Sequence, residues 1–248
     1  MTDAPPLLKV AGVTKLFGVL RALDGVDVTV RAGNFHGLIG PNGSGKSTLL
    51  KAIAGAHFPT AGTIRFGEHD ITRWAPYQRA RAGLSLKFQI TAVMPELSVY
   101  DNVLLALQSA GSAWSLVLSR SRRRLHAQVM QALERFRRAD RAGDLAGELS
   151  HGEQQWLEIA IALAPGPKLL LLDEPTGGMS PEERRVTGEL LLPLKSEFAL
   201  VIVEHDLDFI KNICDHLTVL DQGRVLCDGT VQEIEDSPEI QRVYTTRV

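Results

Sequence analysis

Short apolar runs recur along most of this chain, and several of them alternate with polar residues or end at a glycine. Such runs predict β-strands, because a strand buried on one face has a period of two and a strand buried on both faces is continuously apolar. The predicted strands are Leu7–Val13, Val26–Val30, Phe35–Ile39, Thr63–Phe66, Leu84–Phe88, Leu169–Leu172, Ala199–Val203, Leu217–Leu220 and Arg224–Cys227. Asp24-Gly25 predicts a turn between the first two strands.

Helical signals are concentrated elsewhere. A helix is predicted from Lys46 to about Gly55, because glycine commonly ends a helix. From Thr91 to Gly147 the strand signals vanish, and helical spacing appears in Val103–Leu107 and Arg124–Phe136. We interpret this stretch as a mostly helical insertion. The alternation of strands and helices outside it predicts an α/β fold with a largely parallel sheet that is covered on its faces.

Composition narrows the class of protein. The 248 residues are 44% hydrophobic and 6% aromatic, which is typical of a soluble enzyme, and the net charge of -2 disfavours a general nucleic-acid-binding surface. We interpret the arginines between Arg120 and Arg141 as a solvated helix face rather than a phosphate or lipid contact. Cys214 and Cys227 form no disulfide framework and are expected to be reduced core residues. No secretory leader is recognised, and no stretch approaches the ~20 apolar residues that span a bilayer, so any membrane component would be another chain.

The most specific motif lies between the strand Phe35–Ile39 and the helix that follows it. It consists of Gly40, Pro41, Asn42, Gly43, Ser44, Gly45, Lys46, Ser47 and Thr48. A glycine-rich loop between a strand and a helix is a P-loop, whose backbone N–H groups and helix N-terminus bind phosphate. We expect Lys46 to reach the β- and γ-phosphates of ATP, Ser47 to ligate Mg²⁺ and Thr48 to support the α-phosphate.

Two carboxylates follow the apolar run Leu169–Leu172. Because ligands of open α/β sheets bind at the carboxyl ends of the strands, Asp173 and Glu174 are expected to lie beside the P-loop. Asp173 would hold Mg²⁺ through its water shell, and Glu174 would act on the attacking water as general base or positioning group. A strand that ends in acids is common, so this assignment depends on its pairing with the P-loop.

Further segments give the chain a family resemblance. Leu149-Ser150-His151-Gly152-Glu153 resembles a signature motif that is usually Leu-Ser-Gly-Gly-Gln, and Gly178-Met179-Ser180 occupies the position of the D-loop. With the P-loop and the acidic strand end, these segments make the chain similar, over almost its whole length, to the ATPase subunit of an ATP-binding cassette (ABC) transporter.

The resemblance implies an architecture. It implies a P-loop NTPase of the ABC type, with an α/β core whose sheet is mixed and largely parallel, an antiparallel β subdomain and a helical subdomain. Residues 1–248 would form one ATPase domain, in which the helical subdomain, at about 91–164, is inserted in the RecA-like core.

The resemblance also implies roles for single residues. Gln89 would contact Mg²⁺ and the membrane partner, His205 would sense the γ-phosphate, and Phe17 would stack on adenine. Glu174, His205 and Gln89 would then be catalytic, and the metal would be held by Ser47, Gln89 and Asp173. Taken singly, His205 would more often be structural, Phe17 would more often be a core residue, and Gln89 would indicate nothing.

The signature segment has two compatible interpretations. Ser150 and Glu153 form a Ser-x-x-Glu capping box before an apolar helix. The free N–H groups of a helix start also bind anions, and in this family they serve the γ-phosphate of the opposite subunit. Ser150, His151, Gly152 and Glu153 are therefore expected to cap ATP that is held by a second cassette. Departures from the family pattern are His151 for glycine, Glu153 for glutamine, and Ser180 for the D-loop aspartate.

Within the family, the segments around the signature and the acidic strand end are most similar to the ATPases of branched-chain amino acid and urea-type importers. The resemblance implies a peripheral protein at the cytoplasmic face of the membrane. Its expected partners are integral membrane permease subunits, a second ABC ATPase in a homo- or heterodimer and, indirectly, a solute-binding protein, with no nucleic acid. A lipid-export ATPase and a soluble ABC ATPase of DNA repair or translation stay open as alternatives. A small-molecule P-loop kinase is a third class, but it has no use for the signature segment.

Overall fold

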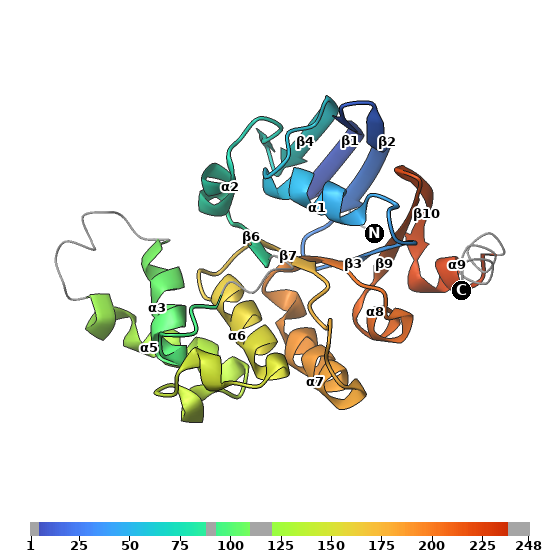
Figure 1. Cartoon of the computed structure of the whole chain (residues 1–248). Coiled ribbons are helices and arrows are strands. Elements are labelled where there is room, and N and C mark those ends of the chain that lie inside the picture. The colour runs from blue at the N-terminus through green and yellow to red at the C-terminus, as the bar shows by residue number, and fades with distance from the viewer. Residues whose placement is uncertain (1–4, 88–92, 110–120, 238–248) are drawn as a thin grey trace.

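A computed structural model describes residues 5–87, 93–109 and 121–237 of the chain, and its strands form two sheets (Figure 1). The larger sheet has the order β10 (Arg224–Thr230), β9 (His216–Asp221), β3 (Phe35–Ile39), β8 (Ala199–Val203), β7 (Leu169–Asp173) and β6 (Leu84–Lys87). Its neighbouring strands are parallel except β9 and β10. The smaller, antiparallel sheet has the order β2 (Leu20–Val30), β1 (Leu8–Phe17), β4 (Ala61–Phe66) and β5 (His69–Asp70).

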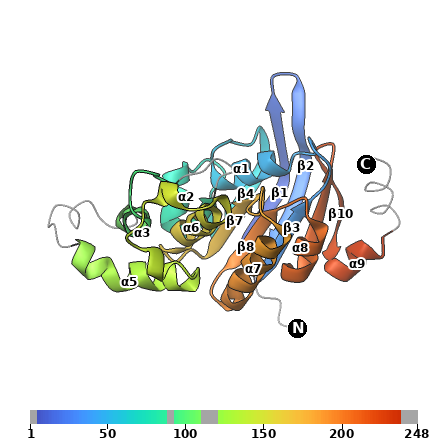
Figure 2. The ribbon, with the colours of Figure 1, turned by 60° about the horizontal axis from the view of Figure 1, so that its bottom comes forward.

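Helices cover both faces of the larger sheet and extend from one end of it. They are α1 (Lys46–Ala54), α2 (Pro76–Ala82), α3 (Val99–Ser109), α5 (Ser121–Arg135), α6 (His151–Leu163), α7 (Pro181–Leu191), α8 (Leu207–Ile213) and α9 (Val231–Glu235). Short 3₁₀ turns lie at Ala139–Arg141, Ala146–Glu148 and Leu192–Ser196. Figure 2 shows α3 and α5 at one end of the molecule and β10 with α9 at the other. None of the helices in the described ranges has the length and apolarity to cross a membrane.

Strand β7 explains how the layers pack. All five of its residues are buried, and successive side chains point to opposite faces of the sheet. Leu169 and Leu171 pack in a hydrophobic cluster with α1 and the smaller sheet, whereas Leu170 and Leu172 pack in a second cluster with α6 and α7. The continuous apolar run in the sequence therefore reflects burial of the strand on both faces of the sheet.

The helices α3 and α5 have a hydrophobic core of their own. Val103 of α3 and Leu133 of α5 are fully buried in it together with Leu157 of α6. Helix α6 also contributes Trp156 and Ile159 to the cluster beneath the larger sheet. This arrangement supports one domain with a helical subdomain at about 91–164, a division that stays a prediction.

Most of the predicted elements are confirmed with small shifts of their ends, but the turn at Asp24-Gly25 was wrong. Both residues lie inside β2, and the chain reverses at Gly18-Val19, after Phe17 pairs with Leu20. The pairing of β1 with β2 shifts register three times along the ladder, and Gly25 has φ +68°. A local irregularity of the ladder, rather than a chain reversal, therefore accounts for the Asp-Gly pair.

An arginine that the sequence analysis did not single out closes the carboxyl end of α1. Arg79 in α2 is fully buried, and its guanidinium donates to the carbonyl oxygens of Ala52 at 2.7 Å, Ile53 at 2.6 Å and Trp74 at 3.0 Å. Burial lowers the pKa of Arg79 to about 10, so the side chain keeps its charge at neutral pH. A cation at this end of α1 is favourable for the helix dipole and adds hydrogen bonds to carbonyl groups of the last turn, of which Ala52 also accepts from the Gly55 N–H at 3.2 Å. Arg79 thereby holds the P-loop helix in place.

A buried histidine makes the stability of the fold depend on pH. His36 in β3 is 1% exposed, and its Nε2 lies 2.7 Å from the Thr218 hydroxyl. Burial, together with the nearby charge of His216, lowers the pKa of His36 to about 4, and Asp228 opposes the shift. Between about pH 6.5 and about pH 4 the unfolded chain therefore binds a proton at His36 that the folded chain does not bind. The free energy of unfolding falls as the pH falls through this window.

We expect the free energy of unfolding to drop by about 2 kcal/mol from this group between pH 7 and pH 5. Urea unfolding followed by tryptophan fluorescence measures it, with His36→Gln as the comparison because its amide can meet the Thr218 hydroxyl without titrating. Equal pH dependence in the two proteins would contradict the assignment.

Candidate functional site

Three parallel strands end at one edge of the larger sheet, and several of the predicted site residues lie at or just after these ends. The P-loop follows β3, Asp173 and Glu174 are at the end of β7, and His205 comes two residues after β8. A cavity of about 530 Å³ opens there. It is lined by Phe17, Leu20, Arg21, Ala22, Asn42, Gly43, Gly45, Lys46, Ser47, Thr48, Glu174, His205, Gln222 and Gly223.

The P-loop has a backbone that only glycine adopts readily. Gly40 has φ +143°, and a Cβ there would lie 2.0 Å from the Leu220 carbonyl oxygen. Gly45 has φ +105° and forms the N-cap of α1 without a side-chain hydrogen bond to the first turn, which contains no acidic residue. The amide groups at the start of α1 are thus uncapped by side chains, which suits an anion.

Two polar side chains of the loop are arranged for a ligand. The Lys46 ammonium donates to the carbonyl oxygens of Gly40 at 2.8 Å and Pro41 at 3.0 Å, and burial lowers its pKa against the opposing effect of Glu174 and Asp173. The Ser44 hydroxyl is buried and has no hydrogen-bond partner among the described residues. A buried hydroxyl without a partner among the described residues, in the same loop as a lysine that donates to carbonyl oxygens, fits the phosphates of a nucleotide.

Two of the three residues predicted to hold Mg²⁺, Ser47 and Asp173, are in contact at the end of β7. The Ser47 hydroxyl donates to the Asp173 carboxylate at 3.2 Å. Burial raises the pKa of Asp173 above its ordinary value, the Ser47 hydrogen bond opposes this, and the charge of Glu174 raises it further. A hydroxyl and a buried carboxylate are oxygen donors of the kind that Mg²⁺ prefers, so the residues fit the ion.

Glu174 and His205 form a pair at the mouth of the cavity. The Glu174 Oε1 lies 2.7 Å from His205 Nε2. Glu174 has φ +48°, an uncommon value for a residue with a side chain, and its N–H donates to the Val203 carbonyl at 2.9 Å. The end of β8 therefore helps to hold the strained backbone that presents this carboxylate.

Phe17 stands at the rim of the same cavity. Its ring is 43% exposed, packs edge-on against the His57 ring at 5.2 Å, and lies 5.0 Å below the Lys15 ammonium. It is therefore not a core residue, and an exposed aromatic face at the rim can stack on a base.

The signature segment lies apart from this cavity. Ser150 is the N-cap of α6, and its hydroxyl accepts from the Glu153 N–H at 3.3 Å while the Glu153 carboxylate accepts from the Ser150 N–H at 2.9 Å. The predicted capping box is confirmed. None of Ser150, His151, Gly152 and Glu153 lines the P-loop cavity. The P-loop and the Ser150 helix start are thus two separate features of one chain.

The charge of Glu153 is balanced within the chain. Its carboxylate pairs with Arg138 and also with Arg141, whose Nη1 lies 3.1 Å and 3.2 Å from the two oxygens. Arg138 in turn stacks over the Trp156 ring at 5.2 Å. The interpretation of this arginine run as a solvated face was wrong for Arg138 and Arg141, because the sequence does not reveal that α6 brings a carboxylate to them.

The other two departures from the family pattern also have local partners. The His151 Nε2–H donates to the Gly177 carbonyl at 2.9 Å. Ser180 is the N-cap of α7, where its hydroxyl accepts from the Glu183 N–H at 3.3 Å. Ser180 therefore begins a helix and adds no charge to the segment.

Gln89 and the segment 88–92 lie outside the described residues. The cavity residues that sequence reasoning missed are Leu20, Arg21, Ala22, Gln222 and Gly223. They belong to the β1–β2 hairpin and the β9–β10 turn, and no motif marks them because only folding brings these turns to the P-loop. The Asp24 N–H donates to the Gly223 carbonyl at 2.8 Å, and the Gly223 N–H donates to the Ser44 carbonyl at 2.9 Å.

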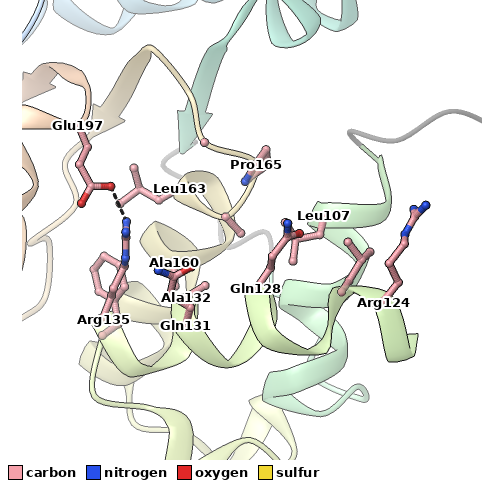
Figure 3. Close-up of a pocket in the computed structure, with 14 residues that line it drawn as sticks. Leu107, Arg124, Gln128, Gln131, Ala132, Arg135, Ala160, Leu163, Pro165 and Glu197 are labelled. Carbon is pink, nitrogen blue, oxygen red and sulfur yellow. Dashed lines mark hydrogen bonds and ion pairs between the residues drawn. The ribbon is translucent and has the colours of Figure 1, made fainter. Parts of the chain in front are cut away.

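A second hollow, of about 490 Å³, lies away from the P-loop, between α5 and the carboxyl end of α6 (Figure 3). Apolar residues such as Leu107 and Leu163 line it, and an ion pair of 2.8 Å between Arg135 and Glu197 crosses one end. Its lining includes none of the predicted site residues.

Comparison with known proteins agrees with this geometry. The family model described as ABC transporter matches residues 23–177. The high-affinity branched-chain amino acid transport ATP-binding protein BraF of Pseudomonas aeruginosa is 34% identical over 248 residues, covering 96% of this chain and 97% of BraF.

Solved structures show the same fold. The ADP conformation of an ATP-binding cassette of an ABC transporter has a TM-score of 0.85 and 29% identity, and the match covers 98% of this chain and 99% of that one. A dimeric cassette in a post-hydrolysis state, bound to ADP and Pi, has a TM-score of 0.76 and 26% identity, and the match covers 90% of this chain and 98% of that one.

Proposed function

Because the chain belongs to the ABC transporter family, as an ATP-binding subunit that hydrolyses ATP, we propose that it encloses Mg·ATP between its P-loop and the Ser150 helix start of a second cassette. The observation that supports this most directly is the separation of the Ser150 segment from the P-loop cavity within one chain. A helix start that lies apart from the chain's own phosphate site is explained if it serves the nucleotide of a partner.

In this proposal each residue of the site has its own role in binding or hydrolysing ATP. Lys46 and the amides of the P-loop bind the β- and γ-phosphates, Phe17 stacks on adenine, and Ser47 with Asp173 holds Mg²⁺. Bound Mg²⁺ supplies positive charge that neutralises the phosphate oxygens. Glu174 positions the attacking water and accepts its proton, while His205 orients the Glu174 carboxylate and senses the γ-phosphate. Gln89 completes the metal site in this proposal.

Replacing Lys46 by alanine tests the phosphate site. We expect ATP affinity to fall about 10- to 100-fold, because charge-assisted hydrogen bonds to phosphate are lost. Titration with a fluorescent ATP analogue measures it, with Lys9→Ala on the exposed side of β1 as the control. Unchanged ATP affinity in the Lys46 variant would contradict the assignment of Lys46 to phosphate binding.

The start of α3 is where we place the membrane partner. The segment from Gln89 to about Asn102 is proposed to contact a cytoplasmic helix of a permease subunit. In its described part, Ser98, Tyr100 and Asp101 line an open hollow of about 840 Å³ together with Arg122 and His126 of α5. An open hollow with aromatic and charged walls suits a partner helix better than a small metabolite.

We further propose that the transporter imports branched-chain amino acids, urea or a related small polar solute, working at the cytoplasmic face of the membrane. The support is the full-length similarity to BraF, a branched-chain amino acid transport protein. A lipid exporter and a non-transport ABC ATPase are the competing outcomes.

Purification of the native membrane complex tests this assignment. The expected result is co-purification with integral membrane proteins and a second cassette, with ATPase activity stimulated by a solute-binding protein loaded with leucine or urea. Stimulation by lipid alone would support export, and co-sedimentation with ribosomes or DNA without a membrane partner would overturn transport.

A further inference from the structure

The signature segment and the catalytic carboxylate of the same chain are joined by a short run of hydrogen bonds. The His151 Nε2–H donates to the Gly177 carbonyl at 2.9 Å. The Gly177 N–H donates to the Glu174 carbonyl at 3.2 Å, and the Glu174 carboxylate meets His205. The connection therefore runs from the start of α6 to the pair at the mouth of the P-loop cavity through one turn of backbone.

The turn that receives His151 is anchored on both sides. The Thr176 N–H and hydroxyl donate to the buried Glu204 carboxylate at 2.8 Å and 2.6 Å. Met179 is 3% exposed and packs in the cluster beneath the sheet. The exposed residue Gly177 thus lies between two residues that are held in place. We therefore expect the position of its carbonyl group to depend on the position of the end of β7.

Missing side chains let the two segments approach each other. A Cβ on Gly178 would lie 2.9 Å from the His151 Nε2, and a Cβ on Gly152 would lie 2.2 Å from the Glu183 carboxylate. Glu183 is itself held by the Ser180 N–H and hydroxyl, both at 2.8 Å. The start of α6 is therefore in close contact with the segment that leads into α7 at Gly178 and with α7 itself at Glu183.

From these contacts we propose that His151 is a positioning residue, which couples the phosphate cap that the chain offers its partner to the alignment of the chain's own Glu174. This inference depends on the proposed two-cassette site. A glycine at position 151 has no side chain to make the bond, so the histidine gives this chain a link that the usual signature cannot form. When the α6 start closes on the partner's nucleotide, the bond draws the Gly177 turn with it and sets Glu174 for hydrolysis.

The test compares His151→Gln with His151→Phe in the purified transporter complex. A glutamine amide can donate to the Gly177 carbonyl, whereas phenylalanine keeps a ring and loses the donor. We expect His151→Phe to lower kcat about five-fold, the effect of one hydrogen bond of about 1 kcal/mol, with KM for ATP unchanged. His151→Gln should retain at least about half of the kcat on the same reasoning.

A substitution at Gly178, which faces the His151 ring, tests the same link independently. Gly178 has φ +76°, so Gly178→Ala strains the turn in any background. Beyond that strain it should push the His151 ring away and lower kcat in the wild-type background, but it should add less in His151→Ala, where neither the ring nor the link is present. Additive losses would overturn the coupling. So would an unchanged kcat in His151→Phe, or equal impairment of the phenylalanine and glutamine variants.

These outcomes are distinct from failure of the proposed function. If the wild-type complex lacked a second cassette or had no ATPase activity with any membrane partner, the two-cassette site itself would be wrong. If the wild-type complex is active and the variants match it, only the role of His151 falls. Thermal unfolding and ATP affinity of the isolated His151 variants should stay at wild-type values, which separates positioning from damage to the fold.

Discussion

Replacing Glu174 by glutamine is expected to lower ATP hydrolysis at least about 100-fold while ATP still binds, because the amide cannot accept a proton from water. The substitution keeps the size of the side chain and leaves an oxygen that can accept from His205 Nε2, now 2.7 Å from the carboxylate. The P-loop, Ser47 and Asp173 are untouched. The loss should therefore appear in kcat and not in nucleotide affinity.

Steady-state phosphate release and binding of a fluorescent ATP analogue measure the two quantities. Glu182→Gln on the exposed surface of α7 is the matched control, since it makes the same chemical change away from the cavity. Hydrolysis above about a tenth of the wild-type rate in the Glu174 variant would contradict its role as base.

The same variant tests the sharing of the nucleotide. With hydrolysis blocked, Mg·ATP should hold two cassettes together, as a homodimer or with a sister subunit, and light scattering in the presence of the natural partners would detect the dimer. A variant that binds Mg·ATP and stays monomeric even beside those partners would refute the two-cassette site.

Replacing Lys87 by methionine is expected to cost about 3–5 kcal/mol of folding free energy, because it leaves the buried Glu158 carboxylate without its cation. The Lys87 Nζ lies 3.0 Å from Glu158 Oε2, and both side chains are 2% exposed. The pair joins the end of β6 to the middle of α6, so it holds the signature helix against the larger sheet. For a chain of this size the midpoint of thermal unfolding should fall by about 10 °C.

Two controls separate the buried charge from loss of packing. The double variant Lys87→Met/Glu158→Met should recover most of the stability, because an apolar pair of similar volume avoids the desolvation of two charges. Lys211→Met breaks a pair of 2.7 Å whose side chains are 36% and 37% exposed, and it should cost at most about 1 kcal/mol. Urea unfolding measures all three, and a double variant as unstable as Lys87→Met would show that the charges are not the cause.

Local patterns were enough to predict most of the fold and much of the candidate site. Three features could be predicted from neighbouring residues alone. The run Leu169–Leu172 indicates continuous burial, the glycines of the P-loop indicate a backbone without Cβ atoms, and the Ser150 capping box indicates a helix start. The α/β class and the presence of Glu174 at a strand end follow from such short-range rules. The helix from Lys46 ends at Gly55 for the same reason.

Long-range contacts decided the rest. Arg79 closing α1, Lys87 meeting Glu158, and Arg138 balancing Glu153 all join segments whose separation in the chain leaves no periodic signal. The bond from His151 to Gly177 spans 26 positions and has no motif. Sequence patterns therefore predicted the α/β class and the candidate groups, and the family resemblance implied the two subdomains. The partners of these groups depended on how helices and strands pack, because pairing across a core is set by three-dimensional proximity and not by order along the chain.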